Sequence, residues 1–125
     1  PLYPCHKSPA GDRWAYLNMA KQNRAVLEKI ALNFRALSEP TRLAILQELK
    51  AGPRTVNEIV VAIGLSQANV SKQLGILRDA GFLHREPRGT SALYSIGDKM
   101  VMELCALVCE RLNKHALANL ETFSI

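Results

Sequence analysis

Two short helical patterns separated by a tight junction constrain the fold of this chain more than any other feature. The first, T-V-N-E-I-V-V-A-I, begins at Thr55, and the second occupies Ser66 to Ala80. Only Gly64-Leu65-Ser66 joins them, a connection typical of a helix-turn-helix. The helical period of the second pattern separates an apolar side from a small, polar and cationic side. The apolar side holds Val70, Leu74 and Leu77, and the other holds Ala68, Ser71, Lys72 and Gly75. We expect the polar side to face a partner outside the domain.

Capping signals predict the neighbouring helices. Ser38 before Pro40 indicates the start of a helix over Thr41–Lys50, which Gly52-Pro53 ends. Thr55-x-x-Glu58 has the form of a capping box. Ser66 is expected to cap the next helix and Gly81 to follow its end.

The pattern changes after Gly81. Phe82–Glu86 and Ser91–Ile96 read as two short strands around the turn residues Pro87 to Thr90. A basic hairpin directly after a recognition-type helix is a wing. Gly97-Asp98 then caps a last helix that runs to about Leu120.

The predicted fold class is mostly α with a small β-hairpin: a winged helix-turn-helix in the order α-α-α-α-β-β-α. Residues 1–12 are expected to form a flexible N-terminal arm, because this stretch is rich in proline and has no periodicity. Residues 13–120 are expected to form the winged helix-turn-helix DNA-binding domain.

Composition sets the remaining limits. A chain of 125 residues folds as one domain and needs no metal or disulfide to do so. A net charge of +5 suits a polyanionic partner. Three cysteines, an odd number, are expected to be free thiols. The sequence has no secretory signal at Pro1–His6 and no apolar run of about 18 residues, so we expect a cytoplasmic protein that does not enter a membrane.

The second helix of the pair suits the major groove of DNA, because side chains near the N-terminus of such a helix reach base edges. The candidates are Gln67, Ala68, Ser71 and Lys72. Arginines of the wing are expected to contact the backbone or the minor groove. The further candidates are Arg85, Arg88 and Thr90 in the wing, and Thr41 and Arg42 as phosphate contacts at a helix N-terminus. The alternative for the wing is a solvated hairpin tip.

Three separated strings, F-R-A-L-S-E-P-T-R-L-A-I-L-Q-E-L, G-L-S-Q-A-N-V-S-K-Q-L and A-L-Y-S-I, resemble the ArsR/SmtB family of winged-helix repressors over residues 20 to 115. The resemblance implies a homodimer that is joined by its first and last helices, binds a palindromic operator in double-stranded DNA and is released by a metal or another small effector. Apolar stripes on these helices are what such an interface needs. They contain Leu27, Ile30, Phe34, Val101, Leu104, Cys105, Val108 and Leu112.

The metal sites of the family do not carry over. Where its sensors have a cysteine pair in the third helix, this chain has Glu58-Ile59-Val60-Val61-Ala62. In the last helix Asp98 matches, but Met100 and Arg111 stand at histidine positions.

Cys105 and Cys109 are the remaining effector candidates, with Cys5 on the arm as a third thiol. One helical turn separates the pair by about 5–6 Å between Cβ atoms, which is long for a disulfide but spannable by a soft metal or arsenite. Three roles stay open: inert packing, binding of a soft metal or arsenite, and redox or persulfide sensing.

The function predicted from the sequence is a transcriptional regulator that binds a palindromic operator as a homodimer, most simply a repressor. The alternative is a winged-helix module that docks on protein without touching DNA. An enzyme is not expected, because the chain has no phosphate-binding glycine loop, no G-x-S-x-G and no H-E-x-x-H.

Overall fold

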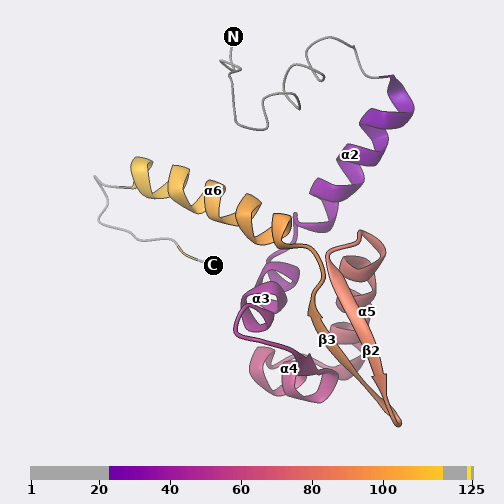
Figure 1. Ribbon diagram of the computed structural model, residues 1–125. Coiled ribbons are helices and arrows are strands. Elements are labelled where there is room, and N and C mark those ends of the chain that lie inside the picture. The colour runs from indigo at the N-terminus through magenta and orange to yellow at the C-terminus, as the bar shows by residue number, and fades with distance from the viewer. Residues whose placement is uncertain (1–22, 117–123, 125) are drawn as a thin grey trace. The chain divides into compact units, whose positions relative to one another are not determined.

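The computed structural model describes residues 23–116 and Ser124. The chain divides into two units, one ending at Leu32 and one beginning at Asn33, so that the boundary lies within the first described helix. Five helices and one three-stranded sheet occupy the described residues (Figure 1). The predicted arm at residues 1–12, and the predicted end of the last helix at Leu120, lie outside them.

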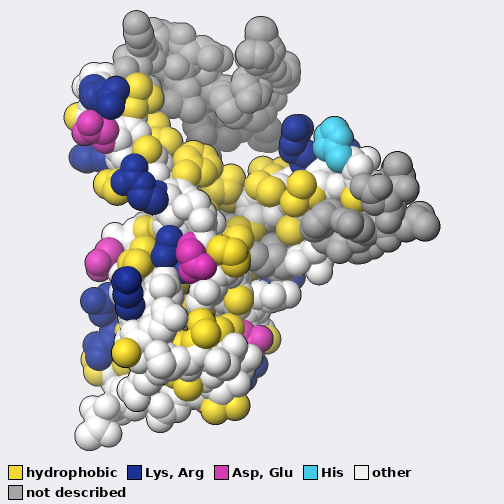
Figure 2. All heavy atoms as spheres, turned by 180° about the vertical axis from the view of Figure 1, so that it is seen from behind, with side chains coloured by type: hydrophobic (Ala, Val, Ile, Leu, Met, Phe, Trp, Pro, Cys, Tyr) yellow, Lys and Arg dark blue, Asp and Glu magenta, His cyan; other side chains and the backbone are white. Residues whose placement is uncertain are grey.

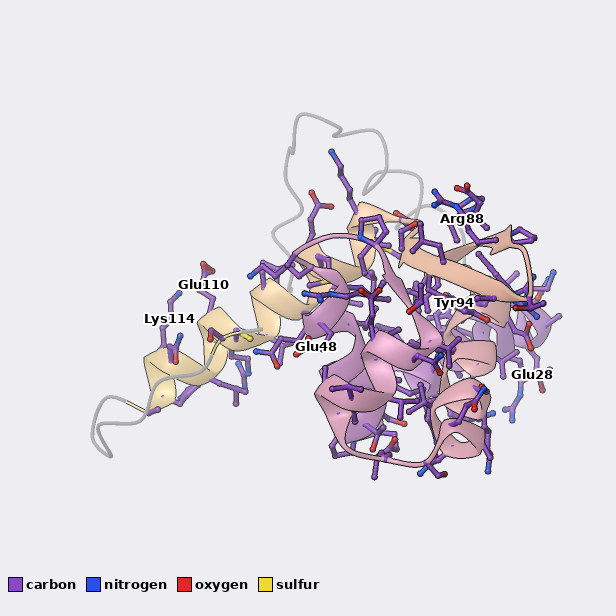
Figure 3. The ribbon with its side chains drawn as sticks, turned by 90° about the horizontal axis from the view of Figure 1, so that it is seen from below. Glu28, Glu48, Arg88, Tyr94, Glu110 and Lys114 are labelled. Carbon is purple, nitrogen blue, oxygen red and sulfur yellow. The ribbon has the colours of Figure 1, made fainter. Side chains whose placement is uncertain are left out.

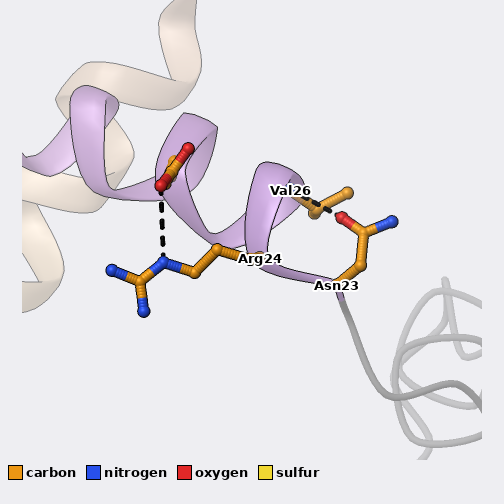
Figure 4. Close-up of polar contacts among 4 residues, drawn as sticks. Asn23, Arg24 and Val26 are labelled. Atoms are coloured by element: carbon orange, nitrogen blue, oxygen red, sulfur yellow. Dashed lines mark hydrogen bonds and ion pairs between the residues drawn. The ribbon is translucent and has the colours of Figure 1, made fainter.

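Helix α2 spans Arg24–Ala36. The Oδ1 atom of Asn23 accepts the backbone N–H of Val26 at 3.0 Å, which satisfies one of the unpaired donors of the first turn (Figure 4). An exposed ion pair joins Arg24 Nε to Glu28 Oε2 at 3.4 Å, one helical turn along. Exposed pairs of this kind add little stability.

Helix α3 spans Pro40–Leu49, one residue earlier at each end than the expected Thr41–Lys50, and its cap is a different residue from the one expected. Glu39 is the N-cap and its side chain accepts the Thr41 N–H, whereas the Ser38 hydroxyl donates back to the Arg35 carbonyl. The prediction that Ser38 is the cap is therefore wrong by one residue. Pro40 takes the first helical position, where a missing N–H costs nothing.

The helix-turn-helix consists of α4 (Val56–Ile63) and α5 (Gln67–Asp79). Thr55 and Glu58 form the predicted capping box, with both reciprocal hydrogen bonds present. Gly64 ends α4 at φ 83°, a left-handed conformation that favours glycine. The Ser66 hydroxyl then caps α5 by accepting the Asn69 N–H.

The wing is formed by β2 (Leu83–Arg88) and β3 (Ser91–Ile96), which pair in antiparallel register from Leu83 opposite Ile96 to Arg88 opposite Ser91. The expected first strand ended at Glu86, before Pro87. Because the sheet order is β1-β3-β2, β2 is an edge strand, and an edge tolerates a proline. A two-residue turn at Gly89-Thr90 replaces the longer loop expected from the sequence.

A third strand, β1 (Arg54–Thr55), was not expected from the sequence and pairs with Tyr94 and Leu93 of β3. It fastens the start of α4 to the wing. Two residues give no alternating pattern that sequence reasoning could detect.

The core lies among α3, α4, α5 and the sheet. Its fully buried large side chains are Phe82, Ile45, Leu46, Ile59, Leu74, Leu77, Val70 and Val101. Helix α6 (Lys99–His115), capped by Asp98, leaves the end of β3 and projects beyond this core (Figure 1). Val101, in the first turn of α6, is 0% exposed. Val101 therefore has no exposed surface in the protomer, and its place in a dimer interface stays a prediction.

Candidate nucleic-acid interface

The first turns of α5 present a polar surface. Val70, Leu74 and Leu77 anchor the helix in the core, and this fixes which side faces out. All four side chains predicted to reach base edges are exposed, namely Gln67, Ala68, Ser71 and Lys72. None of the four is hydrogen-bonded or ion-paired to another described residue. The structure therefore leaves their donors, acceptors and methyl group available to an external partner.

The N-terminus of α5 adds to the anion-attracting character of this surface. The Ser66 hydroxyl satisfies one first-turn N–H, and the remaining free N–H groups carry the positive end of the helix dipole. Lys and Arg side chains gather over α5 in the view from behind (Figure 2). A phosphate is the ligand that this combination favours.

The wing presents a second exposed cationic group of side chains. Arg85, Arg88 and Thr90 are all exposed. Arg88 Nε lies 3.2 Å from Glu86 Oε2, and both side chains are more than half exposed. Such a solvent-screened pair is weak, so the guanidinium can exchange it for a phosphate. Figure 3 shows Arg88 projecting from the outside of the hairpin.

Thr41 and Arg42, the two other predicted phosphate contacts, are only partly exposed. The Arg42 guanidinium is engaged within the molecule. It donates from Nε to the Ala36 carbonyl at 2.6 Å, from Nη2 to the Arg35 carbonyl at 3.1 Å and from Nη1 to Gln73 Oε1 at 2.6 Å. Sequence reasoning missed Gln73, because its partner lies 31 residues away and no local pattern reports that contact.

Gly75 lies farther along the same side of α5. A Cβ atom built there meets no other atom within 4 Å. The protomer's own packing therefore does not require glycine at this position.

The α6 surface is apolar instead. Leu107 is 64% exposed, Val108 51% and Leu112 41%. Hydrophobic side chains run along this helix in Figure 2, while Glu110 and Lys114 project from it in Figure 3. Between α3 and α6 lies an apolar groove of about 560 Å³. Its walls include Phe34, Leu43, Leu104, Cys105, Val108 and Cys109.

The two thiols of α6 differ in environment. Cys105 is 8% exposed, whereas Cys109 is partly exposed. Burial, and secondarily the neighbouring Cys109, raise the pKa of the Cys105 thiol above its usual value. A raised pKa keeps this sulfur protonated at neutral pH and lowers its reactivity.

The described residues do not form a metal site of the family's kind. Helix α4 has no thiol, and the Asp98 carboxylate is used to accept the Met100 N–H as the cap of α6. Within residues 23–116 and Ser124, no three potential ligands among His, Cys, Asp and Glu come together. The thiol pair of α6 supplies two donors, fewer than a closed soft-metal site needs.

Helix α5, its caps and the wing together define a winged helix-turn-helix. A family model described as a helix-turn-helix domain matches residues 37–86, which include α3, α4 and α5. A solution structure from Mycobacterium bovis, titled as the homodimeric winged helix-turn-helix DNA-binding domain of a possible ArsR-family transcriptional regulator, is 30% identical. It superposes with a TM-score of 0.67 over 85% of this chain and 100% of that one.

Two curated relatives agree with this structural match. The transcriptional regulator NmtR of Mycobacterium tuberculosis is 40% identical over 76 residues, which are 61% of this chain and 63% of that protein. A probable mercury resistance operon repressor of Streptomyces lividans is 43% identical over 74 residues, 59% of each chain. The chain belongs to the ArsR/SmtB family of winged helix-turn-helix transcriptional regulators. It spans about three fifths of the length of these two curated relatives.

The structure has no described helix long and apolar enough to span a bilayer.

Proposed function

We propose that this protein is a transcriptional repressor that binds a palindromic operator in double-stranded DNA. The observation that carries the proposal is that Gln67, Ser71 and Lys72, in the first turns of α5, are exposed and have no side-chain hydrogen bond or ion pair to another described residue. Gln pairs with adenine and Lys with guanine in the major groove, while Ser serves either. Exposed Arg85 and Arg88 of the wing supply the adjoining backbone contacts.

The proposal includes a homodimer. Val108 and Leu112 on α6, and Leu27 and Ile30 on α2, are large apolar side chains that the protomer leaves exposed. Burying them against a second copy removes apolar surface from water. Two copies place two α5 helices in successive major grooves, roughly 34 Å apart, which is what a palindromic site requires.

Salt-dependent DNA binding tests the proposal. An operator duplex is selected from a random pool with the wild-type protein, and its Kd is measured at several salt concentrations for Lys72→Ala, Arg88→Ala and the control Lys114→Ala. Each lost phosphate contact reduces the slope of log K against log salt by about 0.9. We expect a weaker slope for the α5 and wing variants and an unchanged slope for the α6 control. Wild-type slopes in both of the first two variants would show that the DNA face is misassigned.

A module that docks on protein is the second candidate function from the sequence. Protein-docking surfaces concentrate aromatic and aliphatic anchors. The exposed face of α5 has instead Gln, Ala, Ser and Lys, and the observation therefore favours DNA. Failure of the wild-type protein to enrich any duplex from the pool would reverse this preference.

We further propose that a thiol-reactive effector, arsenite or a soft metal ion, releases the DNA by acting at Cys105 and Cys109. The two thiols line one apolar groove, and a relative is named as a mercury resistance repressor. Further donors come from outside the described residues, either from Cys5 or from the second protomer. Partly exposed Cys109 is the first sulfur that an effector reaches.

A mobility-shift assay on the selected duplex tests this effector. Arsenite, Zn(II), Cd(II), peroxide and polysulfide are added separately to reduced wild type and to Cys105→Ser/Cys109→Ser. We expect at least one addition to release wild type and to leave the double variant bound. If no addition releases the wild-type protein from the duplex, the two thiols have only a packing role.

A further inference from the structure

Three hydrogen bonds from one side chain connect the end of α2 to the middle of α5. Arg42, in the first turns of α3, donates to the carbonyls of Arg35 and Ala36 and to the Gln73 side chain. All of these groups lie in the unit that begins at Asn33. The guanidinium therefore bridges three helices.

The hydrogen bonds from Arg42 to the carbonyls at the end of α2 are strong, because both the donor and the acceptors carry charge or partial charge. The last carbonyls of a helix have no partner within the helix and carry the negative end of its dipole. The Arg42 guanidinium donates to two of them, the Ala36 carbonyl and the Arg35 carbonyl, which also accepts from Ser38. Hydrogen bonds from a charged donor are the shorter and stronger kind. The Nε contact to Ala36, at 2.6 Å, is among the shortest hydrogen bonds of the described residues.

The hydrogen bonds continue from Arg42 to the exposed surface of α5. Gln73 accepts from Arg42 through Oε1 and donates through Nε2 to Asn69 Oδ1 at 3.0 Å. The Asn69 N–H in turn donates to the Ser66 cap. Both ends of the Gln73 amide are therefore occupied, and the chain of contacts ends in the first turn of α5, beside Gln67 and Lys72.

We propose that Arg42 and Gln73 are positioning residues that hold α5 in its DNA-reading orientation against the end of α2, and that neither contacts DNA. The proposal rests on the function proposed above and deepens it. It differs from the expectation drawn from the sequence, in which Arg42 is a phosphate contact. Both roles require Arg42 for tight binding, but they predict different responses to salt and to a conservative replacement.

The test compares Arg42→Met, Arg42→Lys and Gln73→Met with Lys72→Met on the duplex selected by wild type. We expect each Arg42 and Gln73 variant to lose about tenfold in affinity, which is the typical weight of a hydrogen bond to a charged group. The salt slope should stay at the wild-type value. Lys72→Met removes an exposed cation from the DNA face, together with the counterions that it displaces, and should lower the slope by about 0.9.

Two further outcomes separate the roles. Arg42→Lys keeps the charge but loses the fork, so a positioning role predicts a loss and a phosphate contact predicts near-normal binding. The double variant Arg42→Met/Gln73→Met should bind no more weakly than the worse single variant, because the two changes break one connection. Thermal unfolding identifies variants that do not fold, and if Arg42→Met is one, Arg42→Lys and Gln73→Met decide.

The proposal is overturned if the salt slope falls in Arg42→Met while Gln73→Met binds like wild type. It is also overturned if both variants bind like wild type, in which case the proposed function stands. A wild-type protein that enriches no duplex removes the proposed function and this inference together.

Discussion

The exposed faces of α5 and α6 differ in chemistry, although both helices bury one side in the same core. The outer face of α5 shows Gln67, Ser71 and Lys72, which are polar or charged. On α6, Val108 and Leu112 continue the stripe of Val101 beyond the core and are exposed there, as is Leu107. Exposed polar groups can exchange hydrogen bonds to water for hydrogen bonds to DNA, so binding a polyanion costs them little free energy. Exposed leucine and valine side chains, by contrast, are stabilised when a partner removes them from water.

The difference indicates two kinds of partner for one domain. A cationic, hydrated surface with free hydrogen-bonding groups suits DNA, where phosphate contacts provide affinity and base contacts provide specificity. An apolar helical surface suits another protein surface. Changes that add or remove charge on one face should therefore affect one partner and spare the other, unless dimerisation is itself required for binding DNA.

The largest expected effect comes from a charge on α6. Val108→Glu places a carboxylate on a side chain that is 51% exposed in the protomer, so folding should survive while a second copy is repelled. We expect a monomer by light scattering and a loss of affinity for the selected duplex of more than about 100-fold, because two half-sites no longer act together.

Two controls sharpen this prediction. Glu110→Gln removes a charge from the opposite side of α6 and should leave both mass and affinity unchanged. Gln67→Glu places the same new charge on α5 and should weaken DNA binding while the protein stays dimeric. A dimeric Val108→Glu would place the interface elsewhere.

The sequence predicted features that depend on neighbouring residues better than it predicted contacts between distant segments. Caps are local signals, so the capping box at Thr55 and the Ser66 cap of α5 were predicted correctly. Helical periodicity likewise predicted which side of α5 is buried. These features depend on neighbours within one turn, which the sequence displays directly.

Contacts between distant segments were not predictable in this way. Strand β1 pairs with β3 about 40 residues later and has no pattern of its own. Arg42 was predicted to contact phosphate because it lies near a helix N-terminus. In the structure its guanidinium donates a hydrogen bond to the carbonyl at the end of α2. Val101 belongs to the same stripe as Val108, yet only tertiary packing decides where the core ends and the exposed surface begins.

Thiol labelling tests the α6 side of the comparison with a smaller expected effect. Iodoacetamide should modify Cys109 faster than Cys105 by about tenfold near neutral pH, because Cys105 is buried and its pKa is raised. Raising the pH toward that higher pKa should narrow the difference, since more of Cys105 becomes thiolate. Mass spectrometry of each cysteine peptide over time measures both rates.

The labelling rate of Cys109 also tests whether the dimer covers the groove that this thiol lines. If a second copy covers the groove between α3 and α6, Cys109 should react faster in the monomeric Val108→Glu than in wild type. Equal rates in the two proteins would mean that the groove stays open in the dimer. Faster labelling of Cys105 than of Cys109 would contradict the assigned burial.

The smallest expected effect tests how far along α5 the DNA reaches. Gly75→Ala fills space that no other described residue occupies, and alanine in a helix interior should raise the free energy of unfolding by about 1 kcal/mol. Gly75 shares a side of the helix with Ala68 and Ser71, so a methyl group there points toward the duplex. We expect the variant to melt higher and to bind DNA several-fold more weakly.

Ala68→Gly is the matched opposite change on the same side of α5. It should lower the free energy of unfolding by less than the ~1 kcal/mol of an interior position, because Ala68 lies in the first turn of α5, and it should also weaken binding through loss of its methyl contact. Denaturant unfolding and operator Kd, measured on both variants, separate stability from contact. If Gly75→Ala gains stability with unchanged affinity while Ala68→Gly loses affinity, the duplex contacts only the first turns of α5.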